Sequence, residues 1–276
     1  MKSEWNKLDN AAKIFPAAQS KKDTQVFRFS CELYKTVNKD LLQKATEDTL
    51  EEFDIFKSIL RRGLFWYYLE ESDIKPIVRE EYKIPCSLIY QRNNHKLLFE
   101  VTYYRNRINL EVFHVLTDGT GAMNFLKTLV SNYLALAENT ADSGVDYDAS
   151  STQKSDDSFS KYYSGKISSK QENNPVAYKI VGRKYPDDKL KVINGMVDVK
   201  KVLEESHKYN ATLTAFLSAV LVKSIIDEMP VRSKGKKPIT ILIPVNLRNF
   251  FPSVSARNFF PCSWKRYTDP SRYNQP

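Results

Sequence analysis

The pattern of hydrophobic and polar residues predicts alternating strands and helices in the first half of the chain. Residues 27–33 alternate between apolar and polar side chains, which is the period of a half-buried strand. An apolar stripe then predicts a long helix over about 38–62, which Gly63 ends. A second amphipathic helix is expected to begin near Gly121 and to continue to about Leu134. Short apolar runs predict four further strands, over residues 64–69, 86–90, 97–104 and 107–113.

The composition changes after this second helix. Ser, Asp, Thr, Lys and Asn dominate residues 138–174, and the hydrophobic periodicity disappears. Such a stretch is typical of a flexible linker, with a short helix over residues 159–163 as the alternative.

Periodic structure resumes near residue 176. Two helices are predicted, over residues 199–209 and 213–229, together with strands over residues 177–184, 191–199 and 239–245. The last of these strands is apolar almost throughout, which is typical of a strand buried on both faces. The order of elements predicts a mixed α/β chain with an N-terminal lobe over residues 1–137, a linker over 138–175 and a C-terminal lobe over 176–276.

Composition narrows the class of protein. A hydrophobic fraction of 42% excludes a wholly disordered chain. The three cysteines are far apart and form no cluster with histidine, so neither a disulfide framework nor a metal site is expected. No stretch is apolar for long enough to span a bilayer, and the first ten residues lack the apolar segment of a signal peptide. These features predict a cytoplasmic protein.

The chain is basic, with 42 Lys and Arg against 33 Asp and Glu and a net charge of +9. A nucleic-acid-binding module is therefore an alternative, and the basic and aromatic residues over 264–273 support it best. The densest basic run, residues 232–237, lies between a predicted helix and a predicted strand, where a solvated loop explains it.

One of the three histidines is a candidate for catalysis. His95 lies in a polar turn and His207 on a polar stretch of helix, so both are expected at the surface. His114 follows a predicted strand and has the same parity as Leu110 and Val112, which places its side chain on the core face. A neutral imidazole at the end of a buried strand can remove a proton from a substrate hydroxyl or amine.

A turn containing Asp118, Gly119 and Gly121 follows His114. These residues also allow a purely structural interpretation. Asp118 could cap the next helix, the two glycines could make the strand-to-helix turn, and His114 could be a core histidine whose hydrogen bonds are satisfied. The spacing by itself leaves both interpretations open.

The segment from His114 to Gly119, with the sequence HVLTDG, fits the HxxxDG signature of the CoA-dependent acyltransferase superfamily. That superfamily contains chloramphenicol acetyltransferase, plant alcohol acyltransferases and the condensation domains of peptide synthetases. Residues 243–248 (IPVNLR) and 256–260 (ARNFF) are similar to two stretches of its second lobe. Residues 8–16 (LDNAAKIFP) resemble the start of bacterial proteins that are called alcohol acetyltransferases.

The resemblance implies a two-lobe fold with mixed sheets flanked by helices. It also implies transfer of an acyl group, acetyl above all, from acyl-CoA to an alcohol or amine, with His114 as the general base. Phe113 makes this the single-histidine form of the motif. Asp118 is expected to be structural and to pair with Arg248. Acyl-CoA would be a co-substrate, with no tightly bound cofactor and no metal.

The chain also departs from the superfamily pattern. It stops before the strand that carries the DFGWG-like motif, so we expect a member that is truncated at its C-terminus and whose second lobe is incomplete. An acyltransferase-fold fragment or binding protein without turnover is therefore an alternative to the enzyme. A condensation domain that acts on carrier-bound substrates is a variant of the enzyme hypothesis, and the lack of a carrier module in this chain counts against it.

Overall fold

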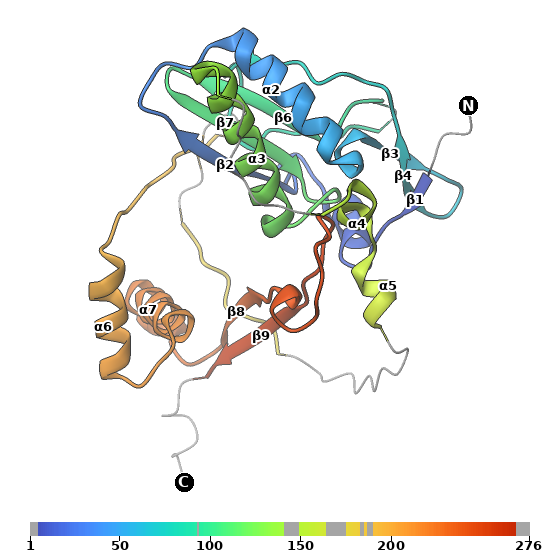
Figure 1. The fold of residues 1–276 in the computed structure, drawn as a ribbon. Coiled ribbons are helices and arrows are strands. Elements are labelled where there is room, and N and C mark those ends of the chain that lie inside the picture. Colours follow the sequence, from blue (N-terminus) through green and yellow to red (C-terminus); the bar gives the residue numbers. More distant parts are fainter. Residues whose placement is uncertain are drawn as a thin grey trace. The chain divides into compact units, whose positions relative to one another are not determined.

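A computed structural model of the chain describes residues 5–92, 94–140, 149–163, 175–182, 185–186 and 190–268. The chain forms two compact units. The first consists of Met1–Gly165 and Asn246–Pro261, and the second of Lys166–Val245 and Cys262–Pro276. The segment Asn246–Pro261, which follows the predicted strand at 239–245, therefore belongs to the same unit as His114. Mixed sheets flanked by helices are present, as the sequence predicts (Figure 1).

The first unit contains two sheets. The larger has the strand order β2-β7-β6-β5, antiparallel except for the parallel pair β5–β6, and the smaller has the order β1-β4-β3 and is antiparallel. The strands are β1 (Trp5–Lys7), β2 (Val26–Glu32), β3 (Ser58–Arg62), β4 (Tyr67–Glu71), β5 (Arg79–Glu80), β6 (Phe99–Tyr104) and β7 (Arg107–Phe113). The helices are α1 (Phe15–Ala18), α2 (Lys39–Glu52), α3 (Gly119–Glu138), α4 (Ser151–Ser155) and α5 (Ser158–Tyr162), with 3-10 turns η1 (Ala12–Ile14), η2 (Asp54–Lys57) and η4 (Leu247–Asn249).

One face of the larger sheet packs against α2 and α3, which lie side by side (Figure 1). In the antiparallel register, Val112 of β7 lies opposite both Phe27 and Phe99, so these three side chains share a face. Phe125 of α3 contacts Phe99 edge to face, with 5.3 Å between the ring centroids. The even-numbered side chains of β7 therefore point toward the helices, and the next even position is His114.

The opposite face of β7 is polar but also buried. Asn109 and Glu111, which alternate with the core residues of the strand, have almost no exposed surface. The carboxylate of Glu111 accepts hydrogen bonds from Arg28 Nε at 2.8 Å and from the backbone N–H of Cys86 at 2.6 Å. A buried carboxylate is tolerated when its desolvation is offset in this way. The central strand is therefore covered on both faces.

The first helix is shorter than the hydrophobic stripe predicts. It begins after Asn38, whose side chain caps the N–H groups of Asp40 and Leu41, and it ends at Glu52. The remainder of the predicted helix forms η2 and β3, and β3 pairs with β4. Pairing between strands far apart in the sequence overrides the local helical pattern. Residues 86–90 are not a strand, because Cys86 has a φ of 59° and its N–H donates to the Glu111 side chain.

Part of the predicted linker is helical. Ser150 and Gln153 form a reciprocal capping box at the start of α4, and the Asp157 side chain caps α5. The hydroxyl of Ser255 donates to the carbonyl of Asp156 at 2.6 Å, so this region packs within the first unit. Residues 141–148 and 164–174 of the predicted linker lie outside the described residues.

The second unit contains α6 (Val199–Lys208), α7 (Leu213–Glu228), a 3-10 turn η3 (Val231–Ser233) and the antiparallel pair β8 (Ile239–Pro244) and β9 (Cys262–Tyr267). Both helices lie where the sequence predicts them. The predicted strands over residues 177–184 and 191–199 are wrong over the described residues, since 177–182 and 191–198 have no regular structure; residues 183–184 lie outside the described part. Strand β8 has the pattern of a strand buried on both faces, but Leu242 is exposed, since β9 is the partner of β8 among the described strands.

The packing at the start of α3 predicts opposite outcomes for two nearby glycines. A Cβ at Gly121 would overlap the carbonyl of Ala256 and the hydroxyl of Thr117, whereas a Cβ at Gly119 would lie 3.8 Å from the Phe29 ring, an ordinary contact. Gly121→Ala should lower the free energy of unfolding by at least about 1–3 kcal/mol, as overpacking does. Gly119→Ala should change it little, and thermal unfolding of the two variants measures the contrast. Equal midpoints would contradict this packing.

Candidate active site

His114 lies directly after β7 and within a group of aromatic rings. Its backbone N–H donates to the carbonyl of Gln25 at 2.9 Å, which continues the pairing with β2 by one residue. The imidazole stacks on the ring of Phe15, with 4.3 Å between centroids and 14° between planes. Phe27 and Phe260 lie against it at 4.9 and 5.6 Å. The ring is half-buried, and it contacts Phe27, which lies opposite Val112 in the register of the sheet.

Asn258 makes hydrogen bonds to both the backbone and the ring of His114. Its amide N–H groups point to the backbone carbonyls of His114 and Val115, at 3.1 and 3.3 Å. The amide oxygen of Asn258 therefore faces His114 Nδ1, at 3.2 Å, and accepts a hydrogen bond from it. A neutral imidazole with its hydrogen on Nδ1 has its lone pair on Nε2. Nε2 is thus the nitrogen that can accept a proton.

The protonation state of His114 follows from its surroundings. Burial lowers the pKa of His114 from its usual 6.5, because a charged imidazolium is poorly solvated among aromatic rings. Hydrogen bonds, including the one to Asn258, and the charge of Asp118 oppose this effect without cancelling it. His114 is therefore neutral, and able to act as a base, at neutral pH.

Asp118 accepts four hydrogen bonds, and together they make both the helix cap and the ion pair with Arg248 that the sequence analysis considered. Its Oδ1 accepts from the N–H groups of Thr120 and Gly121, both at 3.0 Å, and so caps α3. Its Oδ2 accepts from Arg248 Nη1 at 2.7 Å and from the N–H of Phe259 at 2.9 Å. The helix cap and the ion pair with Arg248 are thus made by different oxygens of one carboxylate.

Arg248 holds the segment Asn246–Pro261 in its conformation. Its guanidinium donates to the carbonyl of Ser255 from both Nε and Nη2, at 3.1 and 2.8 Å, and to the carbonyl of Arg257 at 2.6 Å. Because Asn258 follows Arg257 directly, the ion pair with Asp118 also positions the amide that faces His114. Gly121 allows the close approach of Ala256 in the same segment, while Gly119 is exposed.

The structure adds a buried pair, Asp9 and Arg257, that the sequence did not single out as site residues. Asp9 Oδ2 lies 3.8 Å from Arg257 Nε and 3.4 Å from the amide nitrogen of Asn258. Burial raises the pKa of Asp9 to about 6, although the charge of Arg257 opposes the shift. Both residues lie in segments that the resemblance identified, residues 8–16 and 256–260, so the signal was present without a role attached to it.

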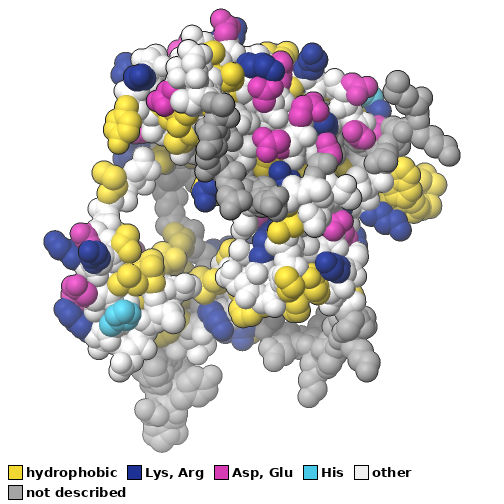
Figure 2. Space-filling model, in the orientation of Figure 1, with side chains coloured by type: hydrophobic (Ala, Val, Ile, Leu, Met, Phe, Trp, Pro, Cys, Tyr) yellow, Lys and Arg dark blue, Asp and Glu magenta, His cyan; other side chains and the backbone are white. Residues whose placement is uncertain are grey.

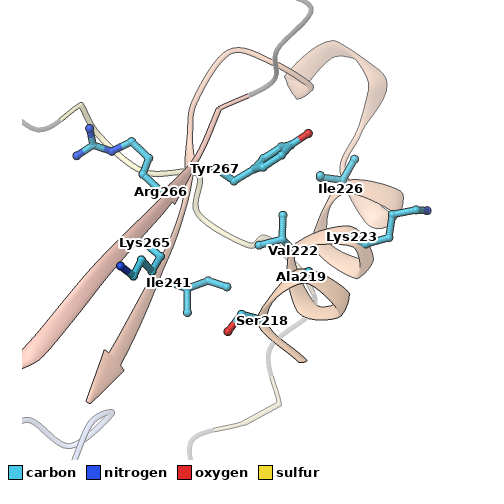
Figure 3. A pocket seen from close by; sticks show the side chains of 9 residues that line it. All are labelled: Ser218, Ala219, Val222, Lys223, Ile226, Ile241, Lys265, Arg266 and Tyr267. Atoms are coloured by element: carbon cyan, nitrogen blue, oxygen red, sulfur yellow. The ribbon is translucent and has the colours of Figure 1, made fainter. Parts of the chain in front are cut away.

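The other two histidines and the pocket in the second unit show no such arrangement. His95 and His207 are exposed, as predicted, and His95 contacts Arg61. A cavity of about 310 Å³ lies between α7 and the β8–β9 pair (Figure 3). Its polar side chains are those of Ser218, Lys223, Lys265, Arg266 and Tyr267, so it offers no imidazole or carboxylate.

Two further classes of feature are absent from the described residues. Over the ranges that the structure describes, no group of three or more His, Cys, Asp or Glu residues could hold a metal ion. No single helix in the described part of the chain is long and apolar enough to cross a bilayer. Helices α6 and α7, bent by 82°, pass that test only as a pair and only by length and composition.

Comparison with solved structures shows the fold. The chain is similar to polyketide synthase associated protein 5 from Mycobacterium tuberculosis, with a TM-score of 0.65 and 17% identity over 95% of this chain and 66% of that one. It is also similar to the first condensation domain of the calcium-dependent antibiotic synthetase, with a TM-score of 0.63 and 12% identity over 97% and 69% of the two chains. The chain thus spans about two thirds of these proteins. No protein-family model and no curated protein matches its sequence.

The geometry of the Asp118–Arg248 pair predicts a large effect on stability when one partner is removed. Arg248→Met leaves a buried carboxylate without its counter-ion and should lower the free energy of unfolding by about 3–5 kcal/mol. Asp118→Asn should also be destabilising, because it leaves the buried guanidinium without a negative partner. The double variant should lose less than the sum of the two. Urea unfolding followed by circular dichroism measures these values.

The matched control is the exposed Lys44–Asp48 pair on α2, whose charged atoms are 2.5 Å apart. Asp48→Asn should cost less than about 1 kcal/mol, since solvent screens that pair. A loss in Arg248→Met no larger than in this control would show that the buried pair does not hold the segment.

Proposed function

We propose that this protein transfers an acyl group from acyl-CoA to an alcohol or amine, with His114 as the general base. The observation that carries the proposal is the hydrogen bond from His114 Nδ1 to Asn258, which leaves Nε2 as the basic nitrogen of a neutral, half-buried ring. The condensation-domain fold and the HVLTDG segment support the same reaction class. The finer assignment, acetyl as the acyl group, comes from the sequence resemblance.

In the proposed reaction His114 Nε2 takes the proton of the acceptor as its oxygen or nitrogen attacks the thioester carbonyl. The imidazolium formed in this step keeps its Nδ1 hydrogen bond to Asn258 Oδ1, which stabilises the developing positive charge. When the tetrahedral intermediate collapses, the bond from carbon to sulfur breaks and the imidazolium returns its proton to the CoA thiolate. The enzyme is thereby restored, and the products are an ester or amide and free CoA.

Asp118 has a structural part in this mechanism. Both of its oxygens are occupied by the four donors described above, so its carboxylate has no role in accepting a proton. Phe15, Phe27 and Phe260 enclose the imidazole and keep the surroundings of the ring apolar. A low local polarity strengthens the hydrogen bond to Asn258 and favours a neutral base at rest.

The decisive experiment measures CoA release. The purified chain is incubated with acetyl-CoA and a panel of small alcohols and amines, and free thiol is followed. General-base catalysis contributes about 100- to 10,000-fold, so His114→Ala should lower kcat/KM at least about 100-fold. The matched controls His95→Ala and His207→Ala, both at exposed histidines, should retain activity.

Near-full activity of the His114 variant would overturn the assignment. Binding of acetyl-CoA without any release of CoA by the parent chain would instead support the alternative, an acyltransferase-fold binding protein without turnover.

The proposal also predicts the direction of the pH dependence. Only the neutral imidazole accepts a proton, so the rate should rise with pH and level off above the pKa of His114. Burial lowers that pKa, which places the half-maximal rate below pH 6.5 and the plateau at neutral pH. A profile of log(kcat/KM) against pH checks this, with an NMR titration of the His114 ring as the independent measurement. A midpoint above 6.5 would contradict it.

A further inference from the structure

The turn between β3 and β4 carries exposed large hydrophobic residues. Leu64 is 84% exposed, Phe65 82% and Trp66 62%, and Trp5 of the neighbouring strand β1 is exposed as well. Figure 2 shows a cluster of hydrophobic side chains beside basic ones over the region where Figure 1 labels β1, β3 and β4. Single exposed hydrophobic residues are ordinary, but three consecutive ones in one turn indicate an interaction surface. We call residues 64–66 the apolar tip.

The apolar tip is displayed on a well-defined hairpin. The N–H of Gly63 donates to the carbonyl of Trp66 at 2.7 Å, which closes the turn, and Arg62 pairs with Tyr67 in the antiparallel register. The rings of Phe65 and Trp66 are 6.3 Å apart. The three apolar side chains are therefore held together at the end of a two-stranded support and remain in solvent.

Basic residues surround the apolar tip. Lys7 and Lys13 line a hollow of about 560 Å³ together with Phe65 and Trp66. The guanidinium of Arg62 lies over the Tyr67 ring, 5.8 Å from its centroid. An acidic side chain, that of Asp157, also lines the hollow.

Two of the described carboxylates illustrate the contacts of the acidic groups in this region. Asp157, which also lines the hollow, accepts the N–H groups of Phe159 and Ser160 at the start of α5. Glu70 forms an ion pair with Arg61. Lys7 and Lys13 outnumber Asp157 among the described residues that line the hollow, so the charge that an approaching surface meets there is positive.

We propose that the apolar tip binds the surface of an anionic lipid bilayer. Leu64 and Phe65 would enter the boundary between headgroups and acyl chains, and Trp66 would lie at the headgroup level, where indole rings are enriched. Lys7, Lys13 and Arg62 would contact lipid phosphates, since basic side chains beside an apolar insertion favour anionic membranes. Exposed apolar side chains with basic side chains beside them match an anionic bilayer, which presents a negatively charged layer above an apolar interior.

Tryptophan fluorescence tests the insertion directly, because the chain has only Trp5, Trp66 and Trp264. The variant Trp5→Phe/Trp264→Phe retains Trp66 alone. Its emission should shift to the blue with phosphatidylcholine vesicles that contain 30% phosphatidylglycerol, and brominated lipid should quench it. The matched variant Trp5→Phe/Trp66→Phe reports on the exposed Trp264 of the second unit and should be neither shifted nor quenched.

Vesicle sedimentation of the full chain tests the two components separately. Leu64→Ser/Phe65→Ser/Trp66→Ser should weaken partitioning at least about 10-fold, because the buried apolar surface is lost. The control Val192→Ser/Ile193→Ser/Met196→Ser removes equally exposed residues from the second unit and should bind like the parent chain. Lys7→Glu/Lys13→Glu should weaken binding to anionic vesicles but not the residual binding to pure phosphatidylcholine.

Three results would overturn the proposal. The parent chain could fail to sediment with anionic vesicles, the control triple variant could lose as much binding as the tip variant, or Trp66 could remain unquenched. A concentration-dependent dimer that the tip variant abolishes would assign the tip to a second copy of this chain instead. None of these measurements depends on acyl transfer. A negative result would therefore reject membrane binding without bearing on the reaction proposed for His114.

Discussion

The carboxylate of Asp118 joins two parts of the first unit that are far apart in the sequence, helix α3 and the segment Asn246–Pro261. It caps α3, it neutralises Arg248, and it accepts the backbone N–H of Phe259. A buried carboxylate is costly unless charged partners and hydrogen bonds offset its desolvation, and here four donors do so. Because the donors come from α3 and from the segment Asn246–Pro261, satisfying this one group brings that segment against the end of β7.

The position of His114 follows from this arrangement through Asn258. Arg248 holds the backbone carbonyls on either side of Ala256, and Asn258 lies immediately beyond. The amide then makes hydrogen bonds both to the backbone carbonyl of His114 and to its ring. The side chain of Asn258 therefore bonds to both the backbone and the ring of His114. These two hydrogen bonds hold the ring in place and favour the tautomer with hydrogen on Nδ1. A residue that is 144 positions away in the sequence thus accepts a hydrogen bond from Nδ1 and leaves Nε2 as the basic nitrogen.

The surroundings of the histidine combine an apolar side and a polar side. Aromatic rings from three segments desolvate the imidazole and lower its pKa, while Asn258 supplies a hydrogen bond and Asp118 a negative charge that oppose the shift. A base needs both features, since desolvation keeps it neutral and a fixed hydrogen bond orients it. The raised pKa of Asp9 shows that the same burial acts on the neighbouring carboxylate.

The sequence by itself determined the elements whose periodicity is local. Periodicity and helix caps predict these elements: strands β2 and β7 and helices α3, α6 and α7. In the strands, side chains alternate between two faces, which also gives the parity of His114. In the helices, a capping side chain marks the start. Tertiary structure decided the rest. Residues 58–62 became a strand only by pairing with β4, and the polar residues Asn109 and Glu111 are buried because partners from other segments satisfy them. Asn258 carries no periodic signal at all. The resemblance of residues 256–260 marked its segment, but its role arises from a distant ion pair and from hydrogen bonds between remote segments, which local periodicity does not reveal.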